Sequence, residues 1–350
     1  MNRNFTQVIV FFVLSLVGSK IWAQQDPHYS QFMFNKLTFN PGYAGATDGK
    51  ICVTLLHRTQ WMGFSSKNTQ QDPILYKDLY QGDAPVDLVG SINAALSPNV
   101  EKFMSRIGVG LTFSKDQLGF ETTVMPKFSL AFRQPFSNQS VLGIGVAFGL
   151  MQKGLDGSKL NALDKADPRV PKGNVQGTGN DIDFGLYYTL PSLGRLFENF
   201  YVGASVTHIN QSKITYEWFE PTGSITIDNK MHFYIVTGAE YQLPIPSMRL
   251  QPNILIKKDP AKIQADLNCF LLWNQNIRGG LTWRPMDAVV VLAGYEFPFG
   301  LNVGYSYDLT TSKILKYSSG SHEIMIRYCF GIKIPPRPRY IRPIYTPRFM

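Results

Sequence analysis

Two histidines, His208 and His232, flank one long polar stretch of the chain that also contains Glu217 and Asp228. Nucleophilic catalysis would need a serine, a histidine and an orienting acid at one site. No serine of this stretch lies in a recognisable nucleophile motif. The stretch therefore offers bases and acids without a nucleophile, and we predict no catalytic residues and no enzymatic activity.

Metal and cofactor chemistry has equally little support. The five histidines are scattered, and neither a Cys-x-x-Cys pair nor an Asp-x-Asp-x-Asp-Gly loop occurs. His322 and Glu323 are adjacent, but such a pair at a strand start is more often a hydrogen-bonded rim feature than an acid–base or metal site. The Gly-x-Gly pairs beginning at Gly108 and Gly143 lie inside expected strands with no helix following, unlike a phosphate-binding loop. We predict no metal site and no cofactor.

Three cysteines, Cys52, Cys269 and Cys329, lie far apart inside expected strands. An odd number cannot form a complete disulfide framework within one chain. We expect these cysteines to be small buried or lipid-facing residues.

The most informative pattern in the chain is an alternation of large apolar residues with very small ones. From Leu142 to Leu150 every second residue is large and apolar, and those between are glycine or alanine. The segments Ser105–Ser114 and Leu301–Asp308 repeat this alternation with small or polar residues. A half-buried strand of a soluble sheet usually has polar side chains opposite its apolar ones, whereas a wall between lipid and a lumen accepts small inward residues. The pattern therefore predicts membrane-spanning strands.

The N-terminus predicts export. Arg3 precedes the apolar run Val8–Val17, and Ala23 offers a cleavage position, so residues 1–23 are typical of a signal peptide. No later stretch approaches the ~20 apolar residues of a membrane helix. Removal of this peptide takes away two basic residues and leaves 32 basic and 25 acidic ones, a net charge of +7. Nucleic-acid binding is not indicated, because the basic residues are thinly spread except near the C-terminus.

Fourteen segments have the ~9 to 11 residues that a tilted membrane strand needs. The long connections, 60–87, 154–180, 210–230 and 310–321, are all odd-numbered and therefore lie at one end of a meander, a distribution typical of outer-membrane barrels. We predict an all-β fold, a transmembrane antiparallel β-barrel of about 14 strands over residues 50–333. Its strands are expected to begin near Lys50, Leu88, Ser105, Thr122, Ser140, Asp181, Phe200, Met231, Met248, Lys262, Asn276, Ala288, Leu301 and His322.

Two segments fall outside this barrel. Residues 24–49 combine an aromatic stretch with the turn sequence Asn-Pro-Gly, and we expect a periplasmic or plug segment against or inside the barrel mouth. Residues 334–350 form a basic, proline-rich tail that cannot be a helix or a strand. An even strand number places both ends of the barrel on one side, so both termini should be periplasmic. The predicted partner-binding residues of the tail are Arg337, Arg339, Tyr340, Arg342, Tyr345 and Arg348.

Short motifs occur in order along the mature chain: Q-D-P-H-Y-S-Q-F at 25–32, N-P-G-Y-A-G at 40–45, H-R-T-Q-W at 57–61, Y-V-G-A-S-V-T-H at 201–208, M-H-F-Y at 231–234, G-Y-S-Y-D at 304–308 and G-S-H-E at 320–323. Together they resemble the PorP/SprF family of the type IX secretion system of Bacteroidetes, and the long tail is similar to its gliding-motility branch. The resemblance implies an outer-membrane barrel that anchors secreted adhesins by their C-terminal domains and contacts periplasmic or lipoprotein components. The residues leave a second function open, a passive solute porin with an unfilled lumen.

Overall fold

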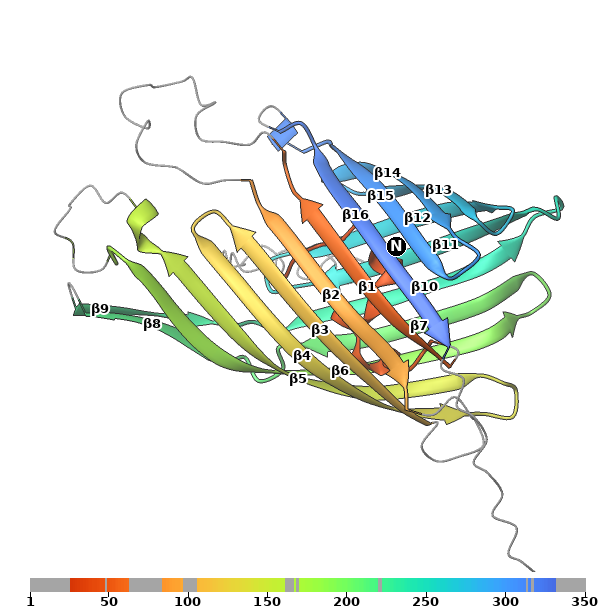
Figure 1. The fold of residues 1–350 in the computed structure, drawn as a ribbon, viewed down its shortest axis with the longest axis horizontal. Coiled ribbons are helices and arrows are strands. Elements are labelled where there is room, and N and C mark those ends of the chain that lie inside the picture. Colours follow the sequence, from red (N-terminus) through yellow and green to blue (C-terminus); the bar gives the residue numbers. More distant parts are fainter. Residues whose placement is uncertain are drawn as a thin grey trace, which may run out of the picture.

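The computed structural model describes residues 26–47, 49–62, 84–96, 106–160, 167, 170–219, 222–312, 314–315 and 318–331. Fourteen strands form one closed barrel in which every neighbouring pair is antiparallel, and the last strand, β16 (Ser321–Gly331), pairs with the first, β1 (Lys50–Thr59) (Figure 1). The others are β2 (Val86–Ala95), β3 (Ile107–Leu118), β4 (Glu121–Pro135), β5 (Val141–Asp156), β6 (Asn174–Leu193), β7 (Phe197–Thr207), β10 (His232–Gln242), β11 (Met248–Lys258), β12 (Ile263–Trp273), β13 (Ile277–Arg284), β14 (Ala288–Glu296) and β15 (Leu301–Thr310). The predicted fold class is confirmed.

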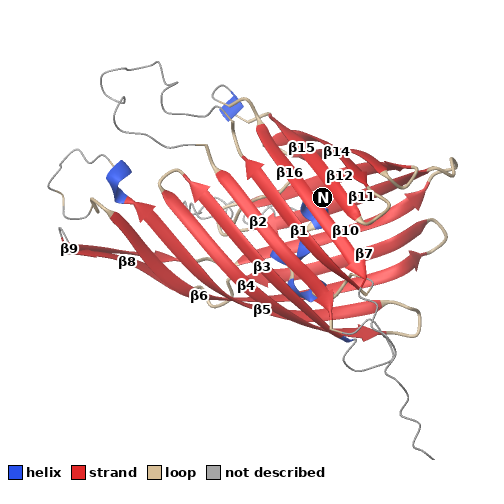
Figure 2. Cartoon of the chain, viewed as in Figure 1, coloured by secondary structure: helices blue, strands red, loops and turns tan. Residues whose placement is uncertain are grey.

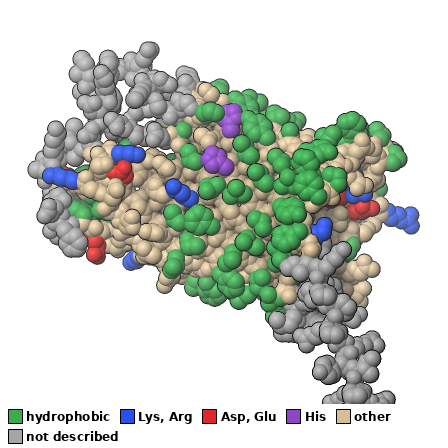
Figure 3. Space-filling view, in the orientation of Figure 1, with side chains coloured by type: hydrophobic (Ala, Val, Ile, Leu, Met, Phe, Trp, Pro, Cys, Tyr) green, Lys and Arg blue, Asp and Glu red, His purple; other side chains and the backbone are tan. Residues whose placement is uncertain are grey.

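The alternation read from the sequence separates the two faces of the barrel wall. On β5 the large side chains point outward, and Phe148 and Leu150 are more than half exposed, whereas Gly143 and Gly145 point inward and are buried. Outward-facing apolar side chains of many strands form a broad hydrophobic surface, and Figure 3 shows it on one face of the barrel. Such a surface matches lipid, because an apolar solvent imposes no penalty on exposed hydrocarbon. Among the described residues, no helix is long or apolar enough to span a membrane.

The connections differ between the two ends of the barrel. The end at which β1 begins and β16 ends, here called the terminal end, carries short turns such as 194–196 and 274–276. The opposite end, here called the loop end, carries the connections 60–85, 157–173, 208–231 and 311–320. This segregation agrees with the expected one, although β5 and β6 extend further toward the loop end than predicted.

One element of the loop end was not predicted. The connection between β7 and β10 contains a separate hairpin, β8 (Lys213–Phe219) and β9 (Thr222–Asp228), which extends past the barrel rim beside β6 (Figure 1). Ile214, Tyr216 and Trp218 alternate along β8 and are buried, and the last two pack with Val175 of β6. The period of two is visible in the sequence, but each strand of the hairpin has seven residues, which is shorter than a membrane strand.

The expectation for the cysteines was wrong for two of them. Cys52 of β1 and Cys329 of β16 form a disulfide on the luminal side of the barrel, whereas Cys269 is free and exposed on the outer surface. The two bonded cysteines are 277 positions apart in sequence, but closure of the barrel makes them cross-strand partners. Sequence distance therefore gave no guide to their pairing.

Loss of this disulfide is expected to destabilise the barrel, because the bond ties the first strand to the last and restricts the unfolded chain. Replacing both Cys52 and Cys329 by serine should cost about 2–4 kcal/mol and lower the thermal unfolding temperature measured in detergent. Cys269→Ser serves as the control and should leave that temperature unchanged. Equal unfolding temperatures for the double variant and the control would contradict a stabilising bond.

Candidate functional site: a segment held inside the barrel

Residues Asp26–Thr47, here called the luminal segment, lie within the barrel and contact the inward faces of its strands. The segment contains three single-turn 3-10 helices, η1 (Phe32–Phe34), η2 (Lys36–Thr38) and η3 (Pro41–Tyr43), which Figure 2 shows between the barrel walls. Its aromatic residues pack against rings of the strands, with Phe39 stacked on Tyr234 and Tyr43 edge-on to Tyr187. A further short helix, η6 (Gly157–Lys159), lies outside the barrel at the loop end. The luminal segment and the inward face of the barrel thus share one hydrophobic core.

Glycines of the barrel wall receive the turn of the luminal segment. A Cβ atom at Gly145 would lie 2.3 Å from the carbonyl oxygen of Pro41, and one at Gly143 would lie 2.3 Å from that of Gly42. Asn40 locks this turn, because its side-chain oxygen accepts a hydrogen bond from the Gly42 amide and its side-chain nitrogen donates one to the Leu186 carbonyl. The space beside the small inward residues, which predicted a membrane barrel, is therefore occupied by backbone of the same chain.

Adding a side chain to this wall should displace the luminal segment. Gly145→Val is expected to cost about 1–3 kcal/mol, because a valine cannot fit against the Pro41 carbonyl without moving η3. The measurement is limited proteolysis of the native protein in detergent, which should release fragments cut within residues 26–47. Gly279→Val is the matched control, since no atom lies within 4 Å of a Cβ atom there. Equal protection of both variants would show that Gly145 does not hold η3.

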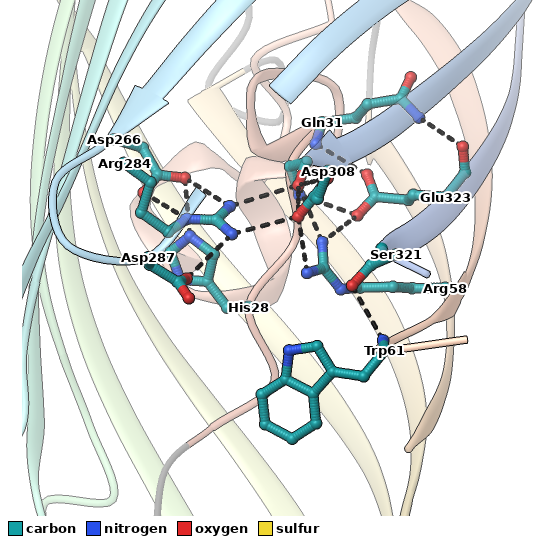
Figure 4. Close-up of polar contacts among 12 residues, drawn as sticks. His28, Gln31, Arg58, Trp61, Asp266, Arg284, Asp287, Asp308, Ser321 and Glu323 are labelled. Atoms are coloured by element: carbon teal, nitrogen blue, oxygen red, sulfur yellow. Dashed lines mark hydrogen bonds and ion pairs between the residues drawn. The ribbon is translucent and has the colours of Figure 1, made fainter. Parts of the chain in front are cut away.

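A cluster of buried charges joins the start of the luminal segment to five strands; we call it the arginine cluster. Asp308 of β15 lies between two guanidinium groups, 2.8 Å from Arg58 Nη2 and 3.2 Å from Arg284 Nη1 (Figure 4). Arg284 also makes two parallel 3.0 Å bonds to Asp266, and Arg58 lies 3.2 Å from Glu323 Oε2. The barrel members of this cluster are between 0 and 2% exposed.

The luminal segment completes this cluster. The backbone amides of Ser30 and Gln31 donate to the two carboxylate oxygens of Glu323, each at 2.8 Å, and the Ser30 hydroxyl donates to Asp308. The His28 Nε2 atom lies 2.7 Å from Asp266 Oδ2, and burial lowers the pKa of His28 while the Asp266 charge opposes that shift. Buried charges are tolerated only when paired and hydrogen-bonded. The segment therefore supplies contacts that the carboxylates need.

A second cluster, here called the histidine cluster, lies where the luminal segment begins. Asp26 Oδ1 lies 2.9 Å from His208 Nε2, and Asp26 Oδ2 lies 3.2 Å from His232 Nδ1. The other ring nitrogen of His208 lies 2.7 Å from Asp181. Burial lowers the pKa of His208, but Asp26 and Asp181 outweigh it and raise the pKa to about 9. Lys127 lies 2.6 Å from Asp181.

At the terminal end, the luminal segment borders a cavity of about 570 Å³. Lys36 is buried there, and its ammonium group lies 4.0 Å from the centre of the Tyr201 ring. Burial lowers the pKa of Lys36 to about 7, and the positive charge of Arg327 adds to this shift. An ammonium group that loses its proton near neutral pH can lie inside the barrel without a carboxylate partner.

The structure brings together some residues discussed in the sequence analysis and separates others. His208 and His232 meet, but the acid that both contact is Asp26, whereas Asp228 lies 3.2 Å from Lys230. Among the described contacts, the ring of His208 bonds to carboxylates and to no serine hydroxyl. His322 and Glu323 lie on opposite faces of β16, with His322 bonded to Tyr305. The predicted tail residues, Arg337, Arg339, Tyr340, Arg342, Tyr345 and Arg348, lie outside the described residues.

The residues that hold the luminal segment were missed as a site, although a signal for them existed. Arg58, Asp266, Arg284, Asp308 and Glu323 each occupy an inward position of an expected membrane strand. A charged residue facing the interior of a membrane protein is a candidate functional group. Which charges meet follows only from barrel closure, because the cluster joins β1, β12, β13, β15 and β16.

The short motifs converge on the luminal segment. H-R-T-Q-W supplies Arg58, G-Y-S-Y-D supplies Asp308 and G-S-H-E supplies Glu323 to the arginine cluster. Y-V-G-A-S-V-T-H supplies His208, and M-H-F-Y supplies His232, to the histidine cluster. Segments that are distant in sequence thus form one docking surface inside the barrel.

The model of the family described as type IX secretion system membrane protein PorP/SprF matches residues 21–328. This chain belongs to the PorP/SprF family. The resemblance seen in the motifs is confirmed, and the match spans the luminal segment and nearly all of the barrel. The PorP/SprF chain is therefore an outer-membrane β-barrel of the type IX secretion system.

Three solved structures illustrate what this PorP/SprF barrel is similar to in fold. The toluene transporter TbuX of Ralstonia pickettii has 11% identity and a TM-score of 0.46, covering 85% of this chain and 93% of its own. A FadL homologue of Pseudomonas aeruginosa has 11% identity and a TM-score of 0.43, with coverages of 83% and 91%. The translocator domain of the autotransporter NalP of Neisseria meningitidis has 12% identity and a TM-score of 0.38, with coverages of 81% and 88%. No curated protein matches the chain.

Proposed function

We propose that this PorP/SprF barrel is a non-enzymatic anchoring component that binds exported adhesins by their C-terminal domains at the cell surface and connects them to periplasmic machinery. One observation supports this reading above the others: the lumen contains the luminal segment, held by buried ion pairs and by a glycine wall. An open solute porin needs a water-filled passage, so a filled lumen favours a binding platform.

In this proposal the loop end faces outward and forms the cargo surface. The β8–β9 hairpin gives that surface a rigid part, because the aromatic side chains of β8 are buried against β6. A rigid element binds with a smaller loss of conformational entropy than a mobile loop does. The terminal end then faces the periplasm, where the basic tail, residues 334–350, meets periplasmic or lipoprotein components.

The test is purification of the native protein from outer membranes in mild detergent, followed by mass spectrometry of what copurifies. We expect a secreted protein with its C-terminal domain, together with a periplasmic or lipoprotein component. Replacing residues 213–228 by a short Gly-Ser turn should remove the secreted protein and keep the periplasmic one, while removing residues 334–350 should do the reverse. A barrel that purifies alone and conducts ions steadily in planar bilayers would instead indicate a porin and refute the proposal.

A Gly-Ser replacement at the terminal end is the control for a general disruption of the barrel by loop replacement. Residues 243–247 form a short turn at the terminal end, between β10 and β11, and a Gly-Ser replacement there should leave cargo copurification unchanged. If this replacement abolished cargo binding as strongly as loss of the hairpin, the loop-end surface would not be the cargo site.

A further inference from the structure

We propose that Asp26, His208 and His232 bind one divalent transition-metal ion, for which Zn²⁺ is the best chemical fit. The three side chains come from the luminal segment, from the residue after β7 and from the first residue of β10. A metal bound there would fasten the start of the luminal segment to the loop end of the barrel. This inference does not depend on the proposed anchoring function.

The ligand atoms already have the spacing that a zinc site requires. Zinc bonds of about 2.0–2.1 Å at tetrahedral angles place two ligand atoms about 3.3 Å apart. The two Asp26 oxygens lie 2.9 Å from His208 Nε2 and 3.2 Å from His232 Nδ1. One ligand atom from each residue can be chosen so that all lie within 4.8 Å of one another. Small side-chain rotations would therefore suffice to admit an ion.

His232 supplies a second, independent observation. The side chain is buried, at 1% exposure, and neither ring nitrogen has a hydrogen-bond partner of good geometry among the described residues. A buried polar group without a partner is unfavourable and calls for an explanation. Coordination of a metal by one nitrogen of the ring would satisfy that group, since neutral imidazole is a common metal ligand.

His208 has the surroundings of a metal-binding histidine. Its Nδ1 atom lies 2.7 Å from an oxygen of Asp181, which leaves Nε2 directed at Asp26. A carboxylate on the far nitrogen is the usual outer-shell partner of a coordinating histidine, because it fixes the tautomer and raises the basicity of the ring. The Tyr234 hydroxyl donates a 2.8 Å hydrogen bond to Asp26 and orients that carboxylate in the same way.

The charges around the cluster and the access to it are compatible with a cation. Three carboxylates surround the cluster, those of Asp26, Asp181 and Asp183. The Lys127 ammonium group contacts Asp181 and Asp183, and the Lys257 ammonium group donates a hydrogen bond to the Asp26 backbone carbonyl. A cavity of about 320 Å³ has Asp26 and His232 in its wall and gives an ion an entry path and room for a water ligand. Binding would displace the proton that His208 shares with its carboxylate neighbours, as metal binding to histidine generally does.

The test measures how many metal ions the full-length protein binds per chain. The protein is purified in detergent, stripped of metal with a chelator and then titrated with Zn²⁺ or Co²⁺. We expect one ion per chain, and for Co²⁺ the visible absorption of a tetrahedral site. Asp26→Asn and His232→Gln should each weaken binding by more than the roughly 10–100-fold that outer-shell changes cost. His57→Gln, which removes an exposed histidine on the outer face of β1, should bind as the wild type does.

Folding of each variant is checked by the mobility shift that intact barrels show on heating before electrophoresis. Asp26 lies outside the strands, so Asp26→Asn keeps the test informative even if His232→Gln disturbs β10. Absence of stoichiometric binding by the wild type would overturn the proposal and leave the cluster as a set of ion pairs. Wild-type binding that persists unchanged in both variants would overturn it as well, because the ion would then lie elsewhere.

Discussion

Deleting residues 26–47 is expected to convert this barrel into an ion-conducting pore. In planar bilayers the conductance should rise by an order of magnitude or more, because a closed barrel of this size leaves an aqueous channel once its lumen is cleared. The wild type should remain near the baseline, since the luminal segment shares a hydrophobic core with the inward-facing residues of the strands. The conductance of the wild type and of the deletion variant, purified in parallel, is measured by single-channel recording.

Two controls keep this result interpretable. Replacement of the turn 243–247 changes the rim and leaves the lumen filled, so its conductance should match the wild type. If the deletion prevents folding, the double variant Gly143→Val and Gly145→Val displaces the segment without removing it and should conduct as well. A wild-type protein that already conducts as strongly as the deletion would show that the luminal segment does not close the barrel.

Arg284→Met is expected to cause the largest loss of stability of any single substitution considered for this chain. The change removes the guanidinium group that bridges Asp266 and Asp308 and leaves buried carboxylates short of a partner. Breaking a buried ion pair in this way costs about 3–5 kcal/mol. The measurement is the thermal unfolding temperature in detergent, together with proteolysis within residues 26–47, which should become faster.

The matched control is another arginine at the barrel rim. Arg249 pairs with Glu240 at 3.4 Å, and its side chain is about one third exposed, so Arg249→Met should cost no more than about 1 kcal/mol. Arg284→Lys keeps the charge but cannot reproduce the paired bonds to Asp266, and its stability should lie between the wild type and Arg284→Met. Similar unfolding temperatures for Arg284→Met and Arg249→Met would mean that the arginine cluster contributes little.

The PorP/SprF sequence shows its barrel because a wall between lipid and lumen must alternate along each strand. Many outward residues of the membrane strands are large and apolar, and so the period of two can be read within a strand and needs no knowledge of its partners. The same local rule explains why the even strand count and the segregation of long loops were predictable. It does not assign β8 and β9, because these strands have seven residues each, fewer than a membrane strand needs, and their buried side chains contact β6.

The short motifs identified the family from the sequence, but the sequence did not show that they all contribute residues that hold the luminal segment. Arg58 and Glu323 are 265 positions apart and lie 3.2 Å from each other, a contact that exists only because β1 pairs with β16. Cys52 and Cys329 meet for the same reason. His208 and His232, which flank one connection in the sequence, come together because β7 pairs with β10, and the luminal segment adds Asp26.

The amino-acid sequence by itself thus determined the fourteen barrel strands, their order and the two faces of the wall, because each follows from side-chain alternation over a few neighbouring residues. Only the tertiary structure decided how residues 26–47 lie within the lumen, which charges pair and which histidines share a site. Those contacts depend on barrel closure, on strand register and on the path of residues 26–47 through the interior. All three are set by residues far apart in the chain, so local patterns carry no information about them.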